Sequence, residues 1–355
     1  MAEIRAAPDA EPATLGAFEV IIDARSPSEF ATDHIPGAVS LPVLNDAERA
    51  EVGRIYVQES RFKARRVGGA YVAANVARHL ETAMADWPPA LRPLVYCWRG
   101  GMRSNSMAVI LAEVGWRTSV LAGGYRTYRR RVSRRLYDDE PVRNVVLLEG
   151  LTGAGKTEVL ARLAAEGVQT LDLEGLAAHR GSLFGALAGR VQPGQKAFES
   201  RLLGALDRLD PARPVVVEAE SSKIGELILP PALWKAMQGA PRIALLAPAE
   251  ARARRLAQIY VADLDLEALP DVLARLDDRI GKKRALAWAA LARAGELEAL
   301  AAELIEAHYD PAYRRSLRKA AGPLLGEVRL TWLGPEAFAE AAAQAVQILA
   351  GRRTS

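Results

Sequence analysis

The segment from Gly150 to Thr157 has the pattern G-x-x-x-x-G-K-T, which constrains the fold of this chain more than any other feature. Apolar residues 145–148 precede this segment and a helical pattern over residues 158–165 follows it. This is the strand–loop–helix context that a phosphate-binding loop requires, because glycines let the backbone wrap around phosphate oxygens with N–H groups directed inward. The pattern therefore predicts a P-loop in a parallel α/β sheet.

The same pattern assigns roles to single residues. Lys156 is expected to contact the terminal phosphate oxygens, and the Thr157 hydroxyl is the group that such loops use to hold Mg²⁺. Glu218 and Glu220 follow the buried strand predicted at residues 215–217, where such folds often place an acidic residue near the metal; a solvated strand end is the alternative. The predicted phosphate-binding residues are Gly150, Thr152, Gly153, Ala154, Gly155, Lys156, Thr157 and Glu218. They indicate a diphosphate or triphosphate ligand with optional Mg²⁺, and we assign no set of protein metal ligands.

The chain has a single cysteine, Cys97, which follows a predicted buried strand at residues 94–96 and precedes a glycine-rich turn and a helix. A thiol at this position faces the unpaired N–H groups and the positive dipole end of the helix. Arg99 and Arg103 add positive charge nearby, and all three factors favour the nucleophilic thiolate. We therefore predict Cys97, Arg99 and Arg103 as a catalytic group; a small buried apolar side chain is the alternative.

Strands alternate with helical patterns throughout the first part of the chain. Strands are predicted at residues 20–23, 39–42, 94–96 and 119–121, and then at 145–148, 170–173, 215–218 and 243–246. This alternation is typical of parallel α/β sheets. We predict one domain over residues 1–135 and a P-loop domain over residues 136–355, which becomes a helical extension from about residue 249. The polar segment at residues 138–141 is the predicted connector.

Bulk composition limits the class of protein. The 355 residues are 50% hydrophobic, enough for two cored domains, and one cysteine excludes an internal disulfide framework. No apolar run reaches membrane-spanning length, and residues 1–9 lack an apolar signal core. We expect a cytoplasmic protein without a membrane partner.

Basic residues gather in two clusters although the net charge is only +4. One cluster spans residues 61–66, and the other contains the six arginines of residues 126–135 with Tyr128 among them. A solvated charged face is one interpretation, and contact with a nucleic-acid backbone is the other. The candidate RNA-binding residues are Arg126, Arg129, Arg130, Arg131, Arg134 and Arg135.

Several motifs resemble a known combination of domains. Residues 23–30, D-A-R-S-P-S-E-F, look like an early rhodanese motif, residues 34–38, H-I-P-G-A, look like its characteristic turn, and residues 120–125 look like its closing glycine pair. Cys97 falls at the position of the rhodanese active-site cysteine. A rhodanese domain followed by a P-loop domain, with C-W-R-G-G-M-R-S and L-E-G-L-T-G-A-G-K-T in that order, resembles the tRNA 2-selenouridine synthase family over nearly the whole chain.

The resemblance implies a transferase that modifies the wobble uridine of certain tRNAs. Such enzymes replace the sulfur of 2-thiouridine with selenium from selenophosphate, and they attach a geranyl group from geranyl diphosphate to that sulfur. The implied co-substrates are selenophosphate and geranyl diphosphate, and the implied partner is the anticodon stem-loop of tRNA. We expect prenylation in the P-loop domain and selenium delivery at Cys97, which carries selenium as a perselenide or activates selenophosphate in another way.

One spacing departs from ordinary rhodaneses and leaves rival interpretations open. Cys97 and Arg103 are spaced C-x5-R rather than C-x4-R, which widens the loop for a larger anion and is also the spacing of cysteine phosphatases. The strongest rival is a small-molecule or RNA kinase with an accessory rhodanese domain. The P-loop favours this kinase interpretation, and so do Arg252, Arg254 and Arg255 if they are lid arginines that contact phosphate. The alternative is that these three arginines form an ordinary charged helix face. A cysteine phosphatase is the second rival, and a non-catalytic tRNA or phosphate-sensing adaptor is the third.

Overall fold

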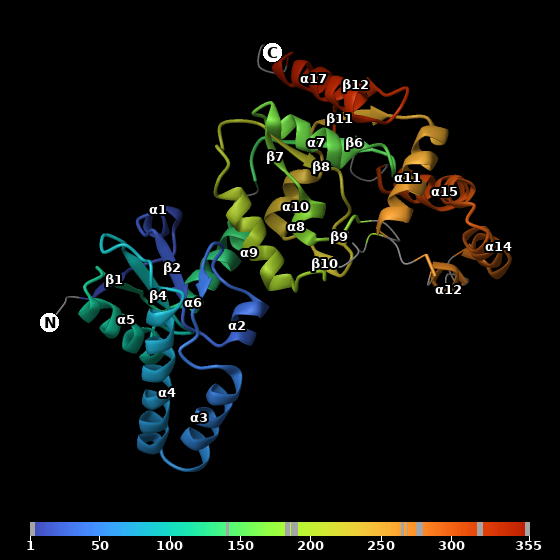
Figure 1. The fold of residues 1–355 in the computed structure, drawn as a ribbon. Coiled ribbons are helices and arrows are strands. Elements are labelled where there is room, and N and C mark those ends of the chain that lie inside the picture. Colours follow the sequence, from blue (N-terminus) through green and yellow to red (C-terminus); the bar gives the residue numbers. More distant parts are fainter. Residues whose placement is uncertain are drawn as a thin grey trace. The chain divides into compact units, whose positions relative to one another are not determined.

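The computed structural model describes residues 4–139, 142–181, 185, 191–263, 266–267, 269–274, 280–317 and 322–351. They form two compact units, each with its own five-stranded sheet (Figure 1). One unit comprises residues 1–139 and 194–207, and the other comprises residues 140–193 and 208–355. None of the helices in the described ranges combines the length and the apolarity that a membrane crossing needs.

The sheet of the first unit has the strand order β1-β5-β4-β2-β3, and all neighbouring strands are parallel. The four strands predicted from sequence are present, and β1 is an addition at one edge. The bounds are β1 Arg5–Ala7, β2 Val20–Asp23, β3 Val39–Ser40, β4 Pro93–Tyr96 and β5 Ser119–Leu121. Because the strands are parallel, their carboxyl ends lie at one edge of the sheet.

Helices surround this sheet, and two of them, α3 and α4, pack against each other as a pair (Figure 1). Asn45 caps the start of α3: its side chain accepts from Glu48 N at 2.8 Å, and Glu48 accepts from Asn45 N at 2.8 Å. The helices are α1 Pro12–Leu15, α2 Pro27–Thr32, α3 Asp46–Gln58, α4 Arg61–Glu81, α5 Met102–Val114, α6 Tyr125–Ser133, the π-helix η1 Arg134–Asp138 and α9 Gln195–Leu206.

The second unit has a parallel sheet of order β12-β11-β6-β8-β7 and a small antiparallel pair, β9 and β10. The P-loop strand β6 is therefore central. The bounds are β6 Val145–Gly150, β7 Gln169–Leu171, β8 Val215–Glu218, β9 Lys223–Ile224, β10 Leu227–Ile228, β11 Arg242–Leu246 and β12 Leu324–Arg329. The predicted α/β class is thus confirmed in both units.

Helices α7 and α17 pack on each other and share an apolar core with β6, β8, β11 and β12. A separate apolar core forms among α11, α12, α14 and α15 with η2. The helices of this unit are α7 Lys156–Ala165, α8 Leu173–Ala177, α10 Pro231–Met237, α11 Ala249–Asp263, α12 Leu269–Ala274, α14 Lys282–Arg293, α15 Leu297–Leu304, the π-helix η2 Ile305–Tyr309, α16 Asp310–Leu317 and α17 Pro335–Gly351.

Two strand predictions need correction. The segment from about residue 249 is not wholly helical, because β12 pairs with β11 at the sheet edge. Only Val328 of β12 is fully buried, so the strand lacks the continuous apolar run by which β6 and β8 are recognised. The strand predicted at residues 170–173 ends at Leu171, because the Asp172 side chain accepts from Gly175 N at 2.7 Å and starts α8.

The compact units of the structure and the predicted domains divide the chain differently. A division at residues 135–136 falls inside η1, and residues 194–207 pack with the first unit although they lie within the P-loop segment of the chain. Glu199 of α9 accepts hydrogen bonds from Arg129 and, at 2.6 Å, from Tyr137. Ser200 donates to Asp33 at 3.0 Å. Polar contacts therefore fix α9 in place, and Glu140 and Pro141 of the predicted connector lie outside the described residues.

Replacing Glu199 with alanine is expected to destabilise the first unit. Glu199 is 2% exposed, and its loss removes the acceptor of the Tyr137 hydroxyl and the carboxylate partner of Arg129, which keeps only the longer contacts to Lys196 O at 3.4 Å and Asp33 at 3.9 Å. We expect a loss of about 2–3 kcal/mol in the free energy of unfolding, measured by urea denaturation. Arg201→Ala, an exposed change on the same helix, is the control and should shift stability by less than about 0.5 kcal/mol. Equal stability of the two variants contradicts this role of α9.

Candidate functional sites

Cys97 lies directly after β4, where the chain turns into α5. Its Sγ atom accepts hydrogen bonds from Gly101 N at 3.3 Å and from the Ser104 hydroxyl at 3.2 Å. The residue is 3% exposed, but these polar groups of the first turn of α5 surround the sulfur. Cys97 is therefore held by hydrogen-bond donors rather than sealed in hydrocarbon.

These donors change the acidity of the thiol. Burial by itself raises the pKa of Cys97, but hydrogen bonds from the Ser104 side chain and from the N–H groups of Ser104, Gly101 and Arg99 outweigh it. The pKa of Cys97 therefore lies below its ordinary value, in the direction that the sequence predicts. The result favours the thiolate, which is the nucleophilic form.

The two arginines predicted beside Cys97 differ in their surroundings. Arg103 donates to Glu29 at 2.7 Å, and Arg49 forms an ion pair with the same carboxylate at 3.0 Å. Arg99 is exposed. Because Glu29 takes the guanidinium of Arg103, the amide and hydroxyl donors of the turn stabilise the thiolate instead.

The closing glycine pair, Gly123 and Gly124, explains how the loop stays close to β5. A Cβ atom at Gly124 (φ 59°) would lie 2.2 Å from the carbonyl oxygen of Cys97, so no other residue fits there. The next residue, Tyr125, donates its N–H to that same oxygen at 2.8 Å. Gly124 thus brings the start of α6 against the cysteine loop.

A buried polar network lies beneath this loop and includes the early Asp-x-Arg motif. Asp23 and Arg25 form an ion pair at 2.6 Å, with both side chains at most 1% exposed. The Tyr96 hydroxyl donates to Asp23 at 2.7 Å and accepts from Ile35 N at 3.2 Å. Asp23 of the motif therefore holds Tyr96, the last residue of β4, and so helps to position Cys97, which follows it.

The P-loop connects β6 to α7 as predicted. Gly153 and Gly155 have φ values of 84° and 86°, a backbone conformation that favours glycine. A Cβ at Gly155 would lie 2.3 Å from the Phe338 ring of α17. Lys156 begins α7 and donates to Gly150 O at 3.2 Å, and Gly150 N donates to the Tyr313 hydroxyl at 3.1 Å.

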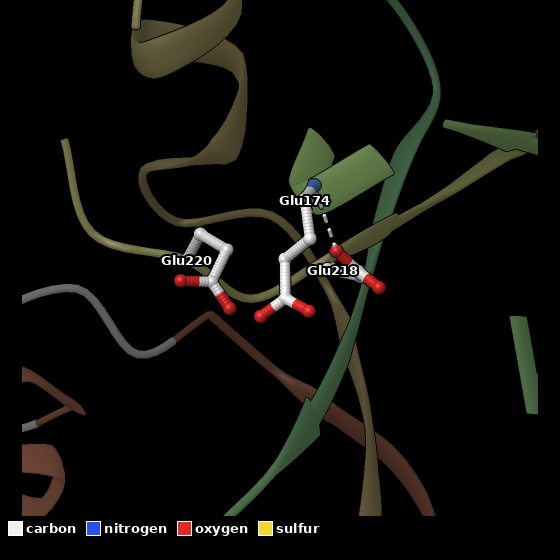
Figure 2. Close-up of side chains that lie close together, drawn as sticks. All are labelled: Glu174, Glu218 and Glu220. Atoms are coloured by element: carbon white, nitrogen blue, oxygen red, sulfur yellow. Dashed lines mark hydrogen bonds between the residues drawn. The ribbon is translucent and has the colours of Figure 1, made fainter. Parts of the chain in front are cut away.

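Three carboxylates lie beside this loop, with ligand oxygens of Glu174, Glu218 and Glu220 within 4.8 Å of one another. Figure 2 shows the carboxylates of Glu174 and Glu220 turned toward each other, with Glu218 beside them. Glu218 accepts from Glu174 N at 3.3 Å, and Thr157 donates to Glu174 at 3.3 Å. The sequence suggested Glu218 and Glu220 but missed Glu174, because it predicted a strand through Asp172 and Leu173.

Burial raises the pKa of all three carboxyl groups, and neighbouring carboxylates add to the shift for Glu218 and Glu220. For Glu220 burial and Glu174 outweigh the opposing effect of Lys156 and raise the pKa to about 8. Burial and the neighbouring carboxylates raise the pKa of Glu218, and burial that of Glu174, with Lys156 acting against both shifts. Burial lowers the pKa of Lys156, but Glu220 and its neighbours overcome this and hold it above its usual range. Lys156 is therefore charged.

The donor set fits a divalent cation. Oxygen ligands suit Mg²⁺, and Glu218 Oε1 is buried without a hydrogen-bond partner in the described part of the chain. Glu174, Glu218, Glu220 and Thr157 are the side chains that would hold it. When bound, Mg²⁺ supplies charge neutralisation for phosphate oxygens.

A cavity of about 410 Å³ adjoins the P-loop. Its lining contains polar side chains, among them Lys156, Glu220 and Arg255, and apolar side chains. The apolar side chains include Trp234, Met237, Leu256 and Ile259. The cavity therefore suits a ligand with an anionic end and a hydrocarbon part.

The three arginines considered as lid residues have different roles. Arg252 is 2% exposed and donates to Asp310 at 2.8 Å. It also donates to Thr152 O at 3.2 Å, and this hydrogen bond links α11 to the P-loop. Arg254 pairs with Glu298 at 3.5 Å. Arg255 forms an ion pair with Glu158 and, unlike Arg252 and Arg254, lines the cavity.

Most of the predicted RNA-binding arginines of α6 and η1 hold protein carboxylates. Arg131 is 7% exposed and donates to Asp207 at 2.7 and 2.8 Å and to Glu11 at 2.6 Å. Arg129 donates to Glu199, Arg134 to Glu11, and Arg135 to Asp139. Arg126 and Arg130 are exposed. Arg134 and Arg135 are exposed as well, so these four arginines are the accessible members of the cluster, whereas Arg131 is buried.

The two sheets and their two centres define a rhodanese-like domain joined to a P-loop domain. A family profile described as "Rhodanese-like domain" matches residues 8–131, and one described as "tRNA 2-selenouridine synthase AAA domain" matches residues 143–328. The chain belongs to the tRNA 2-selenouridine synthase family.

Similar proteins cover most of the chain. A protein named tRNA 2-selenouridine synthase from Aeromonas salmonicida (strain A449) is 35% identical over 323 residues, which span 82% of this chain and 86% of the relative. One of the same name from Cupriavidus pinatubonensis is 35% identical over 338 residues, spanning 85% and 89%. One from Pseudomonas syringae pv. syringae is 37% identical over 252 residues, spanning 70% and 67%.

Replacing Ser104 with alanine is expected to raise the pKa of Cys97, because it removes the strongest donor to the sulfur. The ultraviolet absorbance of the thiolate, titrated against pH, should show its midpoint at higher pH than in the unchanged protein. The thiolate signal comes from Cys97 alone because the chain has one cysteine. Val109→Ala, at a half-exposed position of α5, is the control. An unchanged midpoint for Ser104→Ala means that the hydroxyl does not stabilise the thiolate.

Proposed function

We propose that this protein is a transferase that converts the wobble 2-thiouridine of tRNA to 2-selenouridine. It uses selenophosphate and proceeds through S-geranyl-2-thiouridine, made from geranyl diphosphate. Membership of the family supports the tRNA modification. The observation that carries the geranyl step is the cavity that the P-loop and apolar side chains line together.

Geranyl diphosphate matches both parts of this cavity. Its diphosphate suits the loop amides of the α7 N-terminus and the charged Lys156, and its hydrocarbon chain suits Trp234, Met237, Leu256 and Ile259. The sulfur of 2-thiouridine attacks the first carbon of the chain, the carbon–oxygen bond breaks, and diphosphate leaves with the electron pair. The N3 proton of the base passes to water. Lys156 and the loop N–H groups stabilise the departing diphosphate.

Alkylation prepares the sulfur for replacement. A thiocarbonyl sulfur is a poor leaving group, whereas geranyl thiol is a better one. Attack of selenide at C2 then forms the carbon–selenium bond, and the carbon–sulfur bond breaks to release geranyl thiol. The product is 2-selenouridine.

Cys97 activates selenophosphate in this proposal. Selenium in selenophosphate is already at the selenide level, whereas a perselenide is two electrons more oxidised and requires an oxidant. We therefore favour attack of the Cys97 thiolate on phosphorus, which forms a sulfur–phosphorus bond and releases selenide. Water then hydrolyses the phosphocysteine. The amide and hydroxyl donors that lower the pKa of Cys97 support its role as nucleophile.

Variants at the two centres should separate the two steps. Cys97→Ser should abolish selenation but spare geranylation, and Lys156→Ala should impair geranylation by about 10²-fold or more. The measurement is mass spectrometry of nucleosides from 2-thiouridine tRNA incubated with selenophosphate and geranyl diphosphate. Loss of both products in Cys97→Ser contradicts the division between the units, and normal prenyl transfer in Lys156→Ala contradicts the role of the P-loop.

The same assay tests the rival functions. A kinase shows ATP turnover that tRNA or a small acceptor stimulates, with no change in nucleoside mass. A phosphatase releases phosphate without either modified nucleoside. A binding adaptor leaves the nucleosides unchanged. Any of these results overturns the proposal.

Replacing Glu220 with glutamine is expected to weaken Mg²⁺ binding by about tenfold, because the site loses one anionic oxygen ligand. Mn²⁺ is a convenient probe, and its binding to the full chain is followed by electron paramagnetic resonance. Glu166→Gln, at an exposed position just after α7, is the control and should leave affinity unchanged. Equal affinity of both variants removes Glu220 from the proposed site.

A further inference from the structure

The first unit contains a groove of about 550 Å³ that the proposed function has not used. It lies between α3, α4 and the start of α5. Cavities of ~300–1,000 Å³ commonly hold small organic ligands. Its lining includes Val52, Gly53, Val57, Gly69, Met102 and Arg103.

The floor of this groove is apolar and open. Val52, Val57 and Met102 contribute hydrocarbon, and Val57 is 82% and Met102 59% exposed. A Cβ atom built at Gly53 or Gly69 would meet no atom within 4 Å. Glycine inside a helix is less favourable than alanine, so the open space above these two positions comes at a cost to helix stability.

The groove reaches the turn that holds Cys97. Met102, Arg103 and Ser106 line it, and they belong to the same first turns of α5 as Gly101 and Ser104, which donate to the sulfur. A molecule in the groove therefore lies against the start of α5, the helix that supplies the donors to Cys97, although Cys97, Gly101 and Ser104 do not themselves line the groove.

Positive charge borders the apolar floor. Arg49, Arg65 and Arg103 line the groove. Arg49 and Arg103 pair with Glu29, whereas Arg65 is exposed and has no ion pair among the residues that the structure describes. The Arg61 guanidinium lies 5.5 Å from the centre of the half-exposed Tyr56 ring, which also lines the groove. Hydrocarbon beside arginines and an aromatic ring suits a nucleic acid that bears an apolar substituent.

We propose that this groove holds the geranyl chain of S-geranyl-2-thiouridine tRNA during selenium exchange, with Arg65 on the RNA backbone. The proposal rests on the proposed function and names how its second step recognises its substrate. The chain lies on Val52, Val57 and Met102, and this places the sulfur-bearing carbon near the Cys97 turn. Burial of the chain also holds the geranyl thiol that leaves.

The test compares two synthetic anticodon stem-loops, one with 2-thiouridine and one with S-geranyl-2-thiouridine, for binding to the full chain. The unchanged protein should bind the geranylated RNA at least about tenfold more tightly. Gly69→Leu fills the groove and should remove most of this difference. Ala70→Leu adds the same side chain at an exposed neighbouring position outside the groove lining and should retain it. Thermal unfolding confirms that both variants fold.

A second variant tests the charged rim. Arg65→Glu should weaken binding of both RNAs by a similar factor and reduce the salt dependence of affinity. Selenation of the ready-made geranylated RNA provides the activity readout, and Gly69→Leu should slow it at low RNA concentration.

Three results overturn the inference. They are equal affinity of the unchanged protein for the two RNAs, preserved discrimination in Gly69→Leu, and a change of oligomeric state in Gly69→Leu, which identifies the groove as a protein interface. Failure of the protein to geranylate 2-thiouridine tRNA overturns the proposed function instead. The two failures are distinguishable because the geranylated RNA is supplied ready-made.

Discussion

The first amide groups of a helix have no partner within the helix, and both chemical centres of this protein are built on that constraint. Cys97 accepts from Gly101 N at the start of α5, and the P-loop ends at Lys156, the first residue of α7. Parallel strands place these helix starts at the carboxyl edge of each sheet. Both centres therefore present N–H donors to negative charge, which is a thiolate at Cys97 and, in the proposed function, a diphosphate at the P-loop.

Each unit also contains an apolar cavity bordered by positive charge. In the second unit Lys156 and Arg255 line the cavity, and in the first unit Arg65 and Arg103 line the groove. A polyanion with a hydrocarbon group is the kind of substrate that satisfies both environments. The proposed prenylated RNA has this character in the second step, and its diphosphate donor has it in the first.

Motifs and buried strands were predictable from the sequence because their signals are local. The P-loop, the position of Cys97 and the strands at residues 145–148 and 215–218 were expected, and each depends on contiguous residues. The edge strand β12 escaped prediction because only one of its side chains is fully buried. Glu174 was not predicted as part of the site because the proximity of the three carboxylates depends on which strands are neighbours in the sheet. The spacing of residues in the sequence does not give that strand order.

The arginines of residues 126–135 show the same limit. A run of positive charge in a sequence does not reveal which carboxylates it will meet. Asp207 and Glu199, the partners of Arg131 and Arg129, come from a segment that the sequence assigned to the other domain. Two of the six arginines, Arg129 and Arg131, thus hold α9 and its C-terminal end.

Helix α9 also determines when the first unit can be completed during synthesis on the ribosome. Chains generally fold from the N-terminus as they emerge. In this chain, Asp33, Arg129 and Arg131 cannot form their contacts with Ser200, Glu199 and Asp207, respectively, until those later residues have been synthesised. The P-loop segment at residues 140–193 therefore leaves the exit tunnel before the domain that precedes it has all its parts. Nascent chains of this protein therefore pass through a stage in which residues 1–139, with Cys97, have been synthesised but lack the contacts that α9 supplies.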